Sequence, residues 1–136
     1  HPDHVEASHL VARACYLAGL ARFAAGAGGL SEVRHRPERL LFALYRSAAR
    51  PHLVVDVSEV WERRLAALRA HASQLDPERG PATYLTAPGF LAEVEARARA
   101  LGALIGVAYG EGYRLRGPVP LMDARALLTR PTKEDA

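Results

Sequence analysis

The residues best suited to chemistry stand at the start of the chain, as His1-Pro2-Asp3-His4. Two imidazoles and a carboxylate lie within one turn, and such donors suit zinc, whose catalytic sites typically have three protein ligands and a water. A carboxylate beside an imidazole can also orient the ring and stabilise its protonated form. Because Pro2 disfavours helical geometry at the residue before it, His1 and His4 need not point the same way.

The same four residues also suit an ordinary helix start. Asp3 stands three residues before Glu6, which is a capping-box spacing with Asp in place of Ser or Thr. In this interpretation Asp3 caps the helix and both histidines are solvated. Spacing alone does not decide between the catalytic and the capping interpretation.

The other four histidines are better explained as solvated or structural side chains, since each stands alone: His9, His35, His52 and His71. No second group of His, Asp and Glu with metal-ligand spacing follows in the sequence. One short cluster cannot supply three zinc ligands, a general base and a group that stabilises an oxyanion. If the site is catalytic, we therefore expect its other half on residues outside this chain.

Apolar periodicity predicts three main helices. The first covers residues 5–22 and has mostly small residues on its apolar face. The second covers 58–75. The third begins near Pro88, after the candidate cap Thr86, and its apolar face extends to Ile105.

Two short runs rich in Val, Leu, Phe and Tyr, residues 40–45 and 53–57, predict strands. A last short strand is expected within 111–115 and a short helix near 123–128, while 24–37 is a predicted loop. Helices interleaved with strands indicate α/β architecture. Since two or three strands make a small sheet, we expect this sheet to be part of a larger one.

The composition is that of an ordinary globular protein with one domain: 136 residues, 49% hydrophobic and 24% charged. The net charge is +3, but the arginines are spread along the chain among acidic residues, which does not favour a nucleic-acid binder. No apolar stretch reaches the roughly 18 residues needed to cross a bilayer. The single cysteine, Cys15, excludes an internal disulfide framework and agrees with a cytoplasmic protein.

Several segments, in order along nearly the whole chain, resemble one enzyme family. They are His-Pro-Asp-His at 1–4, Val-Glu-Ala-Ser-His-Leu-Val at 5–11, Ala-Cys-Tyr-Leu-Ala-Gly-Leu at 14–20, Val-Val-Asp-Val-Ser at 54–58, and Gly-Ala-Leu-Ile-Gly-Val-Ala-Tyr-Gly-Glu-Gly-Tyr at 102–113. This pattern resembles the LmbE-like (PIG-L) family of zinc-dependent N-deacetylases. Within that family it is most similar to the deacetylases of bacillithiol biosynthesis, which act on N-acetylglucosaminyl malate.

The resemblance implies a Rossmann-like, three-layer α/β domain of which residues 1–136 form the C-terminal portion, in a cytoplasmic and homo-oligomeric enzyme. It implies His4 as a Zn²⁺ ligand, His1 as the group that stabilises the oxyanion or protonates the leaving amine, and Asp3 as the acid that orients His1. The family's Ala-His-Pro-Asp-Asp motif, which supplies the other zinc ligands and the general base, does not occur in this chain. We therefore expect the chain alone to bind zinc weakly and to be inactive.

Two more residues are weaker candidates for substrate binding. Arg36 precedes a proline and is either close to an acetyl or carboxylate group of the substrate or an ordinary surface residue. Glu111 lies between glycines, where it either approaches the pocket or accepts hydrogen bonds as a turn carboxylate. The expected ligand is a small amino-sugar conjugate, and neither nucleic acid nor a membrane is expected as a partner.

Two alternatives remain beside the malate deacetylase. One is a non-catalytic fragment or interaction module that packs against a partner, which the missing Ala-His-Pro-Asp-Asp motif supports. The other is a deacetylase of the same family with another N-acetylglucosamine substrate. The arginine-rich composition is compatible with an anionic substrate but does not establish one.

Overall fold

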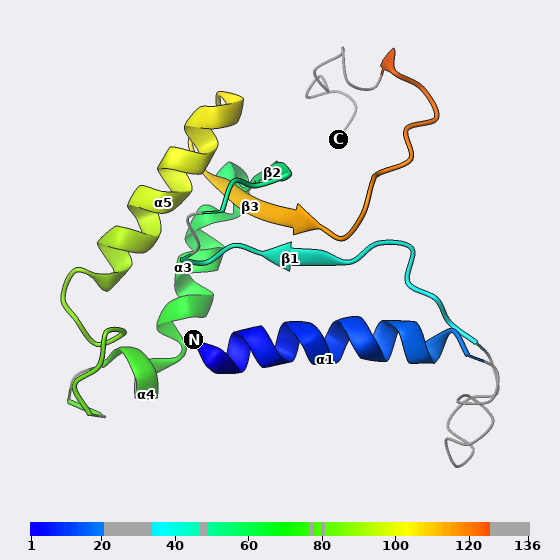
Figure 1. Ribbon diagram of the computed structural model, residues 1–136. Helices are drawn as coiled ribbons and strands as arrows, with labels where there is room; N and C mark the ends of the chain where they lie inside the picture. Colours follow the sequence, from blue (N-terminus) through cyan, green and yellow to red (C-terminus); the bar gives the residue numbers. More distant parts are fainter. Residues whose placement is uncertain (21–33, 47–48, 77, 80, 126–136) are drawn as a thin grey trace.

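The computed structural model of the chain describes residues 1–20, 34–46, 49–76, 78–79 and 81–125. These residues form helices and a small antiparallel sheet, which confirms a mixed architecture of helices and strands (Figure 1). The strands are β1 (Leu41–Ala43), β2 (Leu53–Asp56) and β3 (Gly110–Leu115), in the spatial order β1-β3-β2. The last strand in sequence thus lies between two strands that come much earlier, and it pairs antiparallel with both.

The described helices are α1 (Pro2–Ala18), η1 (Ser58–Val60), α3 (Trp61–Arg69), α4 (Ala72–Leu75) and α5 (Phe90–Ile105). The segment predicted as one helix over 58–75 is therefore divided into three pieces. The break between α3 and α4 lies at His71, where ψ is 51° instead of the negative value of a helix. The predicted loop at 24–37 and the predicted helix near 123–128 fall largely outside the described residues.

The starts of α1 and α5 differ from the predicted ones. Helix α1 begins at Pro2 with His1 as its N-cap, and the His1 side chain accepts a hydrogen bond from the Asp3 N–H. The interpretation of Asp3 as the cap is therefore wrong, because Asp3 belongs to the first turn. Helix α5 has Gly89 as its N-cap, and Thr86 bonds to the backbone of Thr83 instead of capping the helix.

The core is small and lies between α3, α5 and the sheet. Among the described residues, the buried hydrophobic side chains are Val57, Trp61, Leu65 and Ala98, with Val94 and Tyr109 packed against them. Trp61 is only 3% exposed and stacks on Tyr109, with ring centroids 4.2 Å apart and planes 6° from parallel. Helix α5 packs against β2 and β3. The stacked indole also joins α3 to Tyr109, the residue that directly precedes β3.

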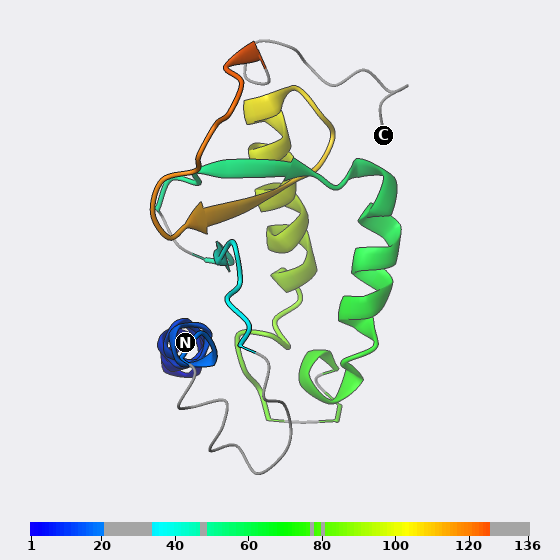
Figure 2. The same ribbon diagram turned by 90° about the vertical axis from the view of Figure 1, so that its right-hand side faces the viewer.

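Helix α1 lies apart from this core. In two views at right angles it follows β1 on the side away from β3 (Figures 1 and 2). None of its residues is buried, and Leu10 on its surface is 68% exposed. Among the described helices, none combines the length and the apolar character needed to span a bilayer.

Two glycines let α5 approach β3 closely. A Cβ on Gly102 would lie 2.7 Å from the carbonyl oxygen of Val107 and 2.9 Å from the amide nitrogen of Tyr109. A Cβ on Gly110 would lie 2.7 Å from the amide nitrogen of Gly102. The helix then ends at Gly106, whose φ of 78° is the left-handed conformation that glycine adopts at helix ends.

Replacing Gly102 with alanine is expected to destabilise the protein by about 1–3 kcal/mol, the usual cost of overpacking. The sign is informative, because alanine in a helix interior is otherwise more favourable than glycine by about 0.5–1 kcal/mol. Urea unfolding followed by the fluorescence of Trp61, the single tryptophan, measures the change. Gly89→Ala is the control, since nothing lies within 4 Å of its added Cβ. A stabilised Gly102→Ala variant would contradict the close contact.

Candidate functional site

The start of α1 brings His1 and Asp3 together. The Nδ1 atom of His1 lies 3.3 Å from the backbone nitrogen of Asp3 and 3.4 Å from its carboxylate Oδ2. The two contacts need opposite protonation states, since Nδ1 must be bare to accept the N–H and must carry a proton to pair with the carboxylate. Protonation of His1 therefore exchanges a capping bond for an ion pair with Asp3.

His4 has a different environment from His1. The two imidazole rings have their centroids 6.4 Å apart and their planes 80° from parallel. The ring of His4 instead lies edge-on to the ring of Tyr45, which follows β1, with centroids 5.8 Å apart. This agrees with the expectation that the two imidazoles point differently, and it places the start of α1 beside the end of β1.

A second polar group lies on the neighbouring strand. The hydroxyl of Tyr113 donates a hydrogen bond of 2.7 Å to the Glu111 carboxylate, whose other oxygen lies 3.4 Å from an Arg64 nitrogen. Glu111 is part of β3, opposite Val55, and not in a turn as its flanking glycines suggested. Arg64 also carries a buried Nη1 with no hydrogen-bond partner among the described residues.

The Tyr113 hydroxyl has a strongly raised pKa. The hydrogen bond to Glu111, then burial, then the charges of Glu111 and Tyr45 raise the pKa of Tyr113 to about 12, against a smaller opposing effect of Arg64. Tyr45 is itself in ring contact with His4. The sequence indicated His4 and Glu111 as candidates but not their partners Tyr45 and Tyr113. The two-residue step from Glu111 to Tyr113 on one strand could have indicated the second pair, whereas no local spacing links Tyr45 to His4.

Arg36 lies elsewhere. Its guanidinium is against Gly19, where an added Cβ would be 3.0 Å from Arg36 Nε. Gly19 ends a helix of 17 residues, so about 25 Å of helix separates Arg36 from His1. In this arrangement one small substrate cannot touch both residues of the same chain, so the prediction of Arg36 as a substrate-binding residue stays a prediction that does not involve His1.

The donors at the start of α1 suit zinc in type but not in number. Imidazole and carboxylate are ordinary zinc ligands. However, in the part of the chain that the structure describes, no group of three or more His, Cys, Asp or Glu side chains is placed to hold a metal ion. His1, Asp3 and His4 therefore do not form a complete zinc site by themselves.

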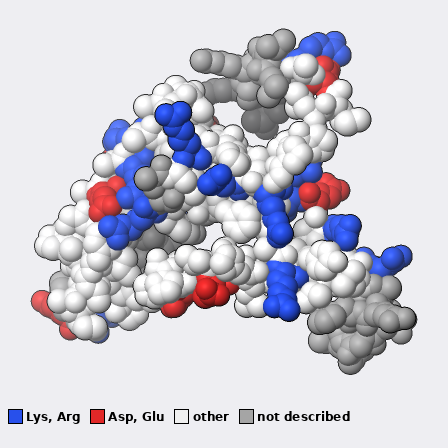
Figure 3. Space-filling view, in the orientation of Figure 1, with Lys and Arg blue, Asp and Glu red and all other residues white. Residues whose placement is uncertain are grey.

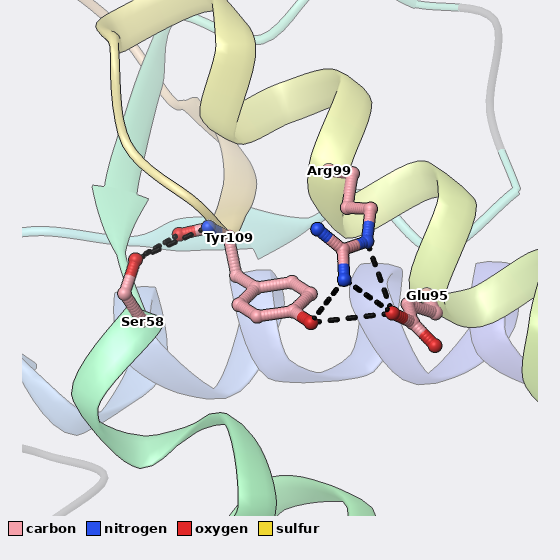
Figure 4. A network of polar contacts seen from close by, with 4 residues as sticks. All are labelled: Ser58, Glu95, Arg99 and Tyr109. Atoms are coloured by element: carbon pink, nitrogen blue, oxygen red, sulfur yellow. Dashed lines mark hydrogen bonds and ion pairs between the residues drawn. The ribbon is translucent and has the colours of Figure 1, made fainter.

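A further polar network links α5 to Tyr109 and Ser58 and has a structural role (Figure 4). The Tyr109 hydroxyl accepts a bond of 2.7 Å from Arg99 and donates one of 3.2 Å to Glu95, while its backbone N–H donates to Ser58. The bonds from Arg99 and Tyr109 lower the pKa of Glu95, whereas burial and the bond to Glu95 raise the pKa of Tyr109. The spacing of Glu95 and Arg99 indicates an ion pair on one helix face, but nothing local predicts Tyr109 as its partner.

The titration of Tyr113 gives a direct test of the Glu111 contact. The phenol is expected to ionise near pH 12 in the folded protein, and Glu111→Gln should move its pKa toward about 10 by removing the principal cause. Because the folded-state pKa is the higher one, the neutral phenol stabilises the fold below about pH 10, and this stabilisation is lost as the pH rises through the folded value. Ultraviolet absorbance of tyrosinate measures the pKa, with Tyr113→Phe identifying the signal.

The matched control for this titration is Glu59→Gln, which removes an exposed carboxylate in η1. It should leave the pKa of Tyr113 unchanged. An equal titration in the wild-type chain and in Glu111→Gln would contradict the hydrogen bond.

In comparison with known protein families, no family model matches this chain.

Proposed function

We propose that this chain is part of a zinc-dependent N-deacetylase that removes the acetyl group from an N-acetylglucosaminyl conjugate. N-acetylglucosaminyl malate is the first substrate to test. The proposal includes a Rossmann-like domain of which the chain is the C-terminal portion, a homo-oligomer and a cytoplasmic location. The observation that carries it is the unlike environment of the two imidazoles, since Asp3 contacts His1 while His4 is turned to Tyr45.

His1 is suited to carry a proton. The Asp3 carboxylate at 3.4 Å stabilises the imidazolium form and orients the ring. A protonated His1 can donate a hydrogen bond to the oxygen that becomes negative when the amide is attacked, or protonate the departing amine. Both ring and carboxylate are largely exposed, at 65% and 85%, so a substrate can reach them.

His4 would hold the metal in this proposal. Zinc, when bound, supplies a Lewis acid for the amide carbonyl and a water of lowered pKa. Since the described residues do not complete a zinc site, the proposal requires further ligands and a general base from outside them. Tyr45 would then fix the orientation of the His4 ring through their edge-on contact.

Glu111 and Arg36 both remain proposed substrate-binding residues, with Arg36 at the other end of α1 from His1. The Glu111 carboxylate is about three-quarters covered and is occupied by Tyr113 and Arg64. Its role would be to hold the Tyr113 hydroxyl, with the substrate's hydroxyl groups competing for the same bonds.

The second candidate function is a non-catalytic interaction module. The observation that favours it is α1, which has no buried residue and exposes apolar side chains such as Val5, Leu10 and Val11. Such a surface suits the binding of another protein. This candidate needs neither zinc nor an intact pair of His1 and Asp3.

The experiment that separates the candidates measures amine release by the zinc-loaded, natural full-length protein. The substrates are N-acetylglucosaminyl malate, a mycothiol-type N-acetylglucosaminyl inositol and an N-acetylchitooligosaccharide. We expect release from the malate conjugate to be fastest. Faster release from either other substrate changes the substrate and keeps the reaction, whereas no release from any of the three refutes the deacetylase.

A further inference from the structure

Helix α1 has specific contacts with the segment around β1 at each of its two ends. At its start, the His4 ring contacts Tyr45, which follows β1. At its end, the carbonyl of Ala18 accepts a hydrogen bond from the His35 N–H, and Gly19 lies against Arg36, both ahead of β1. Between these contacts the helix spans the sheet edge without burying any residue.

A groove of about 930 Å³ fills this interval between α1 and the strands. Its apolar part includes Ala12 from the helix, with Leu40 and Phe42 from the β1 segment. Most of its surface is apolar and open to solvent. The groove is distinct from the start of α1, since none of His1, Asp3 and His4 lines it.

Three arginines line the same groove, namely Arg13, Arg114 and Arg116. Phe42 lies directly opposite Arg114 across the β1–β3 pair, so both side chains are on one face of the sheet, and Arg116 follows on that face two residues later. Arg13 approaches from the helix. Figure 3 shows Lys and Arg side chains gathered where α1 faces the strands.

The lining of the groove carries a net positive charge. Glu38 is the one acidic residue that lines the groove. His9 also lines it, and its Nδ1 atom lies 4.0 Å from the Glu6 carboxylate. No carboxylate of the described residues lies within ion-pair distance of Arg13, Arg114 or Arg116. The three guanidinium groups thus leave a net positive charge beside an apolar wall.

We propose that this groove binds a small amphiphilic organic anion, with an apolar chain against Phe42 and a carboxylate between the guanidinium groups of Arg114 and Arg116. Guanidinium binds carboxylate through two parallel hydrogen bonds, which are stronger than neutral ones. The chain covers the apolar wall, whose exposure to water is unfavourable. This inference does not depend on the deacetylase, because it uses other residues.

The test uses octanoate as the probe and Cys15 as the reporter. Cys15 lines the groove and is the single cysteine of the chain, so its alkylation by uncharged iodoacetamide reports on this site alone. Saturating octanoate is expected to slow the alkylation at least about fivefold, and octylammonium should not. In the double variant Arg114→Gln/Arg116→Gln, the same protection should need about tenfold more octanoate, as expected for the loss of charged hydrogen bonds.

The matched control is Arg63→Gln/Arg69→Gln, which removes the same charge from exposed positions on α3 and should keep the octanoate affinity. Arg114 and Arg116 are themselves exposed, and Trp61 fluorescence verifies that their variant is folded. The inference is overturned by an absence of protection, by equal protection from octylammonium or sulfate, or by an unchanged affinity in Arg114→Gln/Arg116→Gln. If protection of Cys15 instead grows with protein concentration in the absence of octanoate, the groove binds a second copy of the chain, and the inference is overturned as well.

Discussion

A His1→Ala variant of the full-length protein is expected to keep its zinc and to lose turnover by a factor of about 10²–10⁴, the usual contribution of a general acid or base. The reason is that the Asp3 carboxylate lies beside His1 and not His4, which makes His1 the proposed proton carrier. Removing this ring takes away a proton donor and leaves the proposed metal ligand in place. The loss should appear in kcat, since the interaction strengthens as the amide is attacked.

His4→Ala is expected to show the opposite pattern, with stoichiometric zinc lost and turnover lost with it. Each metal ligand contributes directly to affinity, and a zinc site with one ligand removed no longer holds its geometry. Elemental analysis after dialysis gives the metal content of both variants. His9→Ala, on an exposed part of α1 one turn further along, should change neither quantity.

The division of roles is contradicted if His1→Ala and His4→Ala lose zinc equally. In that case both imidazoles bind metal, and the proton carrier lies elsewhere. Asp3→Asn provides a further check, because it should reduce turnover while leaving zinc bound. A role for Asp3 in helix stability alone would instead lower the helix content measured by circular dichroism.

The sequence predicts the elements of this fold better than their arrangement. Residues 53–57 and 111–115 are strands to within a residue because their apolar and aromatic side chains suit a pleated, half-covered surface. That β3 lies between β1 and β2 is not predictable from the same residues, since pairing joins Leu53 and Ala43 to one residue, Tyr113. The break at His71 has no local signal either, because neither glycine nor proline stands there.

In the candidate site, too, a contact between residues close in sequence can be predicted, whereas a contact between distant residues cannot. The contact of His1 with Asp3 follows from their spacing and from Pro2, which sets the helix start. The contact of Arg36 with Gly19 could not be predicted, because the sequence does not show at which end of α1 this side chain lies. Tyr45 could not be singled out, since it meets His4 only when β1 runs back along α1.

Trp61→Ala is expected to lower the free energy of unfolding by about 3–5 kcal/mol, as for other large-to-small changes at buried aromatic residues. The effect should be near the upper end because the core is so small. Among the described residues, the only other buried hydrophobic side chains are those of Val57, Leu65 and Ala98, and none of them can fill the space of an indole. The stack on Tyr109 is lost as well, which loosens the link between α3 and the start of β3.

Urea unfolding of Trp61→Ala must be followed by circular dichroism, since the variant has no tryptophan left. Leu104→Ala is the matched control, because this leucine on α5 is 67% exposed and its loss should change stability by no more than about 0.5 kcal/mol. Trp61→Phe keeps a ring over Tyr109 and should lose less than Trp61→Ala. Equal losses in Trp61→Ala and Leu104→Ala would mean that α3 does not pack on α5 and the sheet as described. They would also mean that this core does not hold Arg64, whose guanidinium lies 5.4 Å from the indole, beside Glu111.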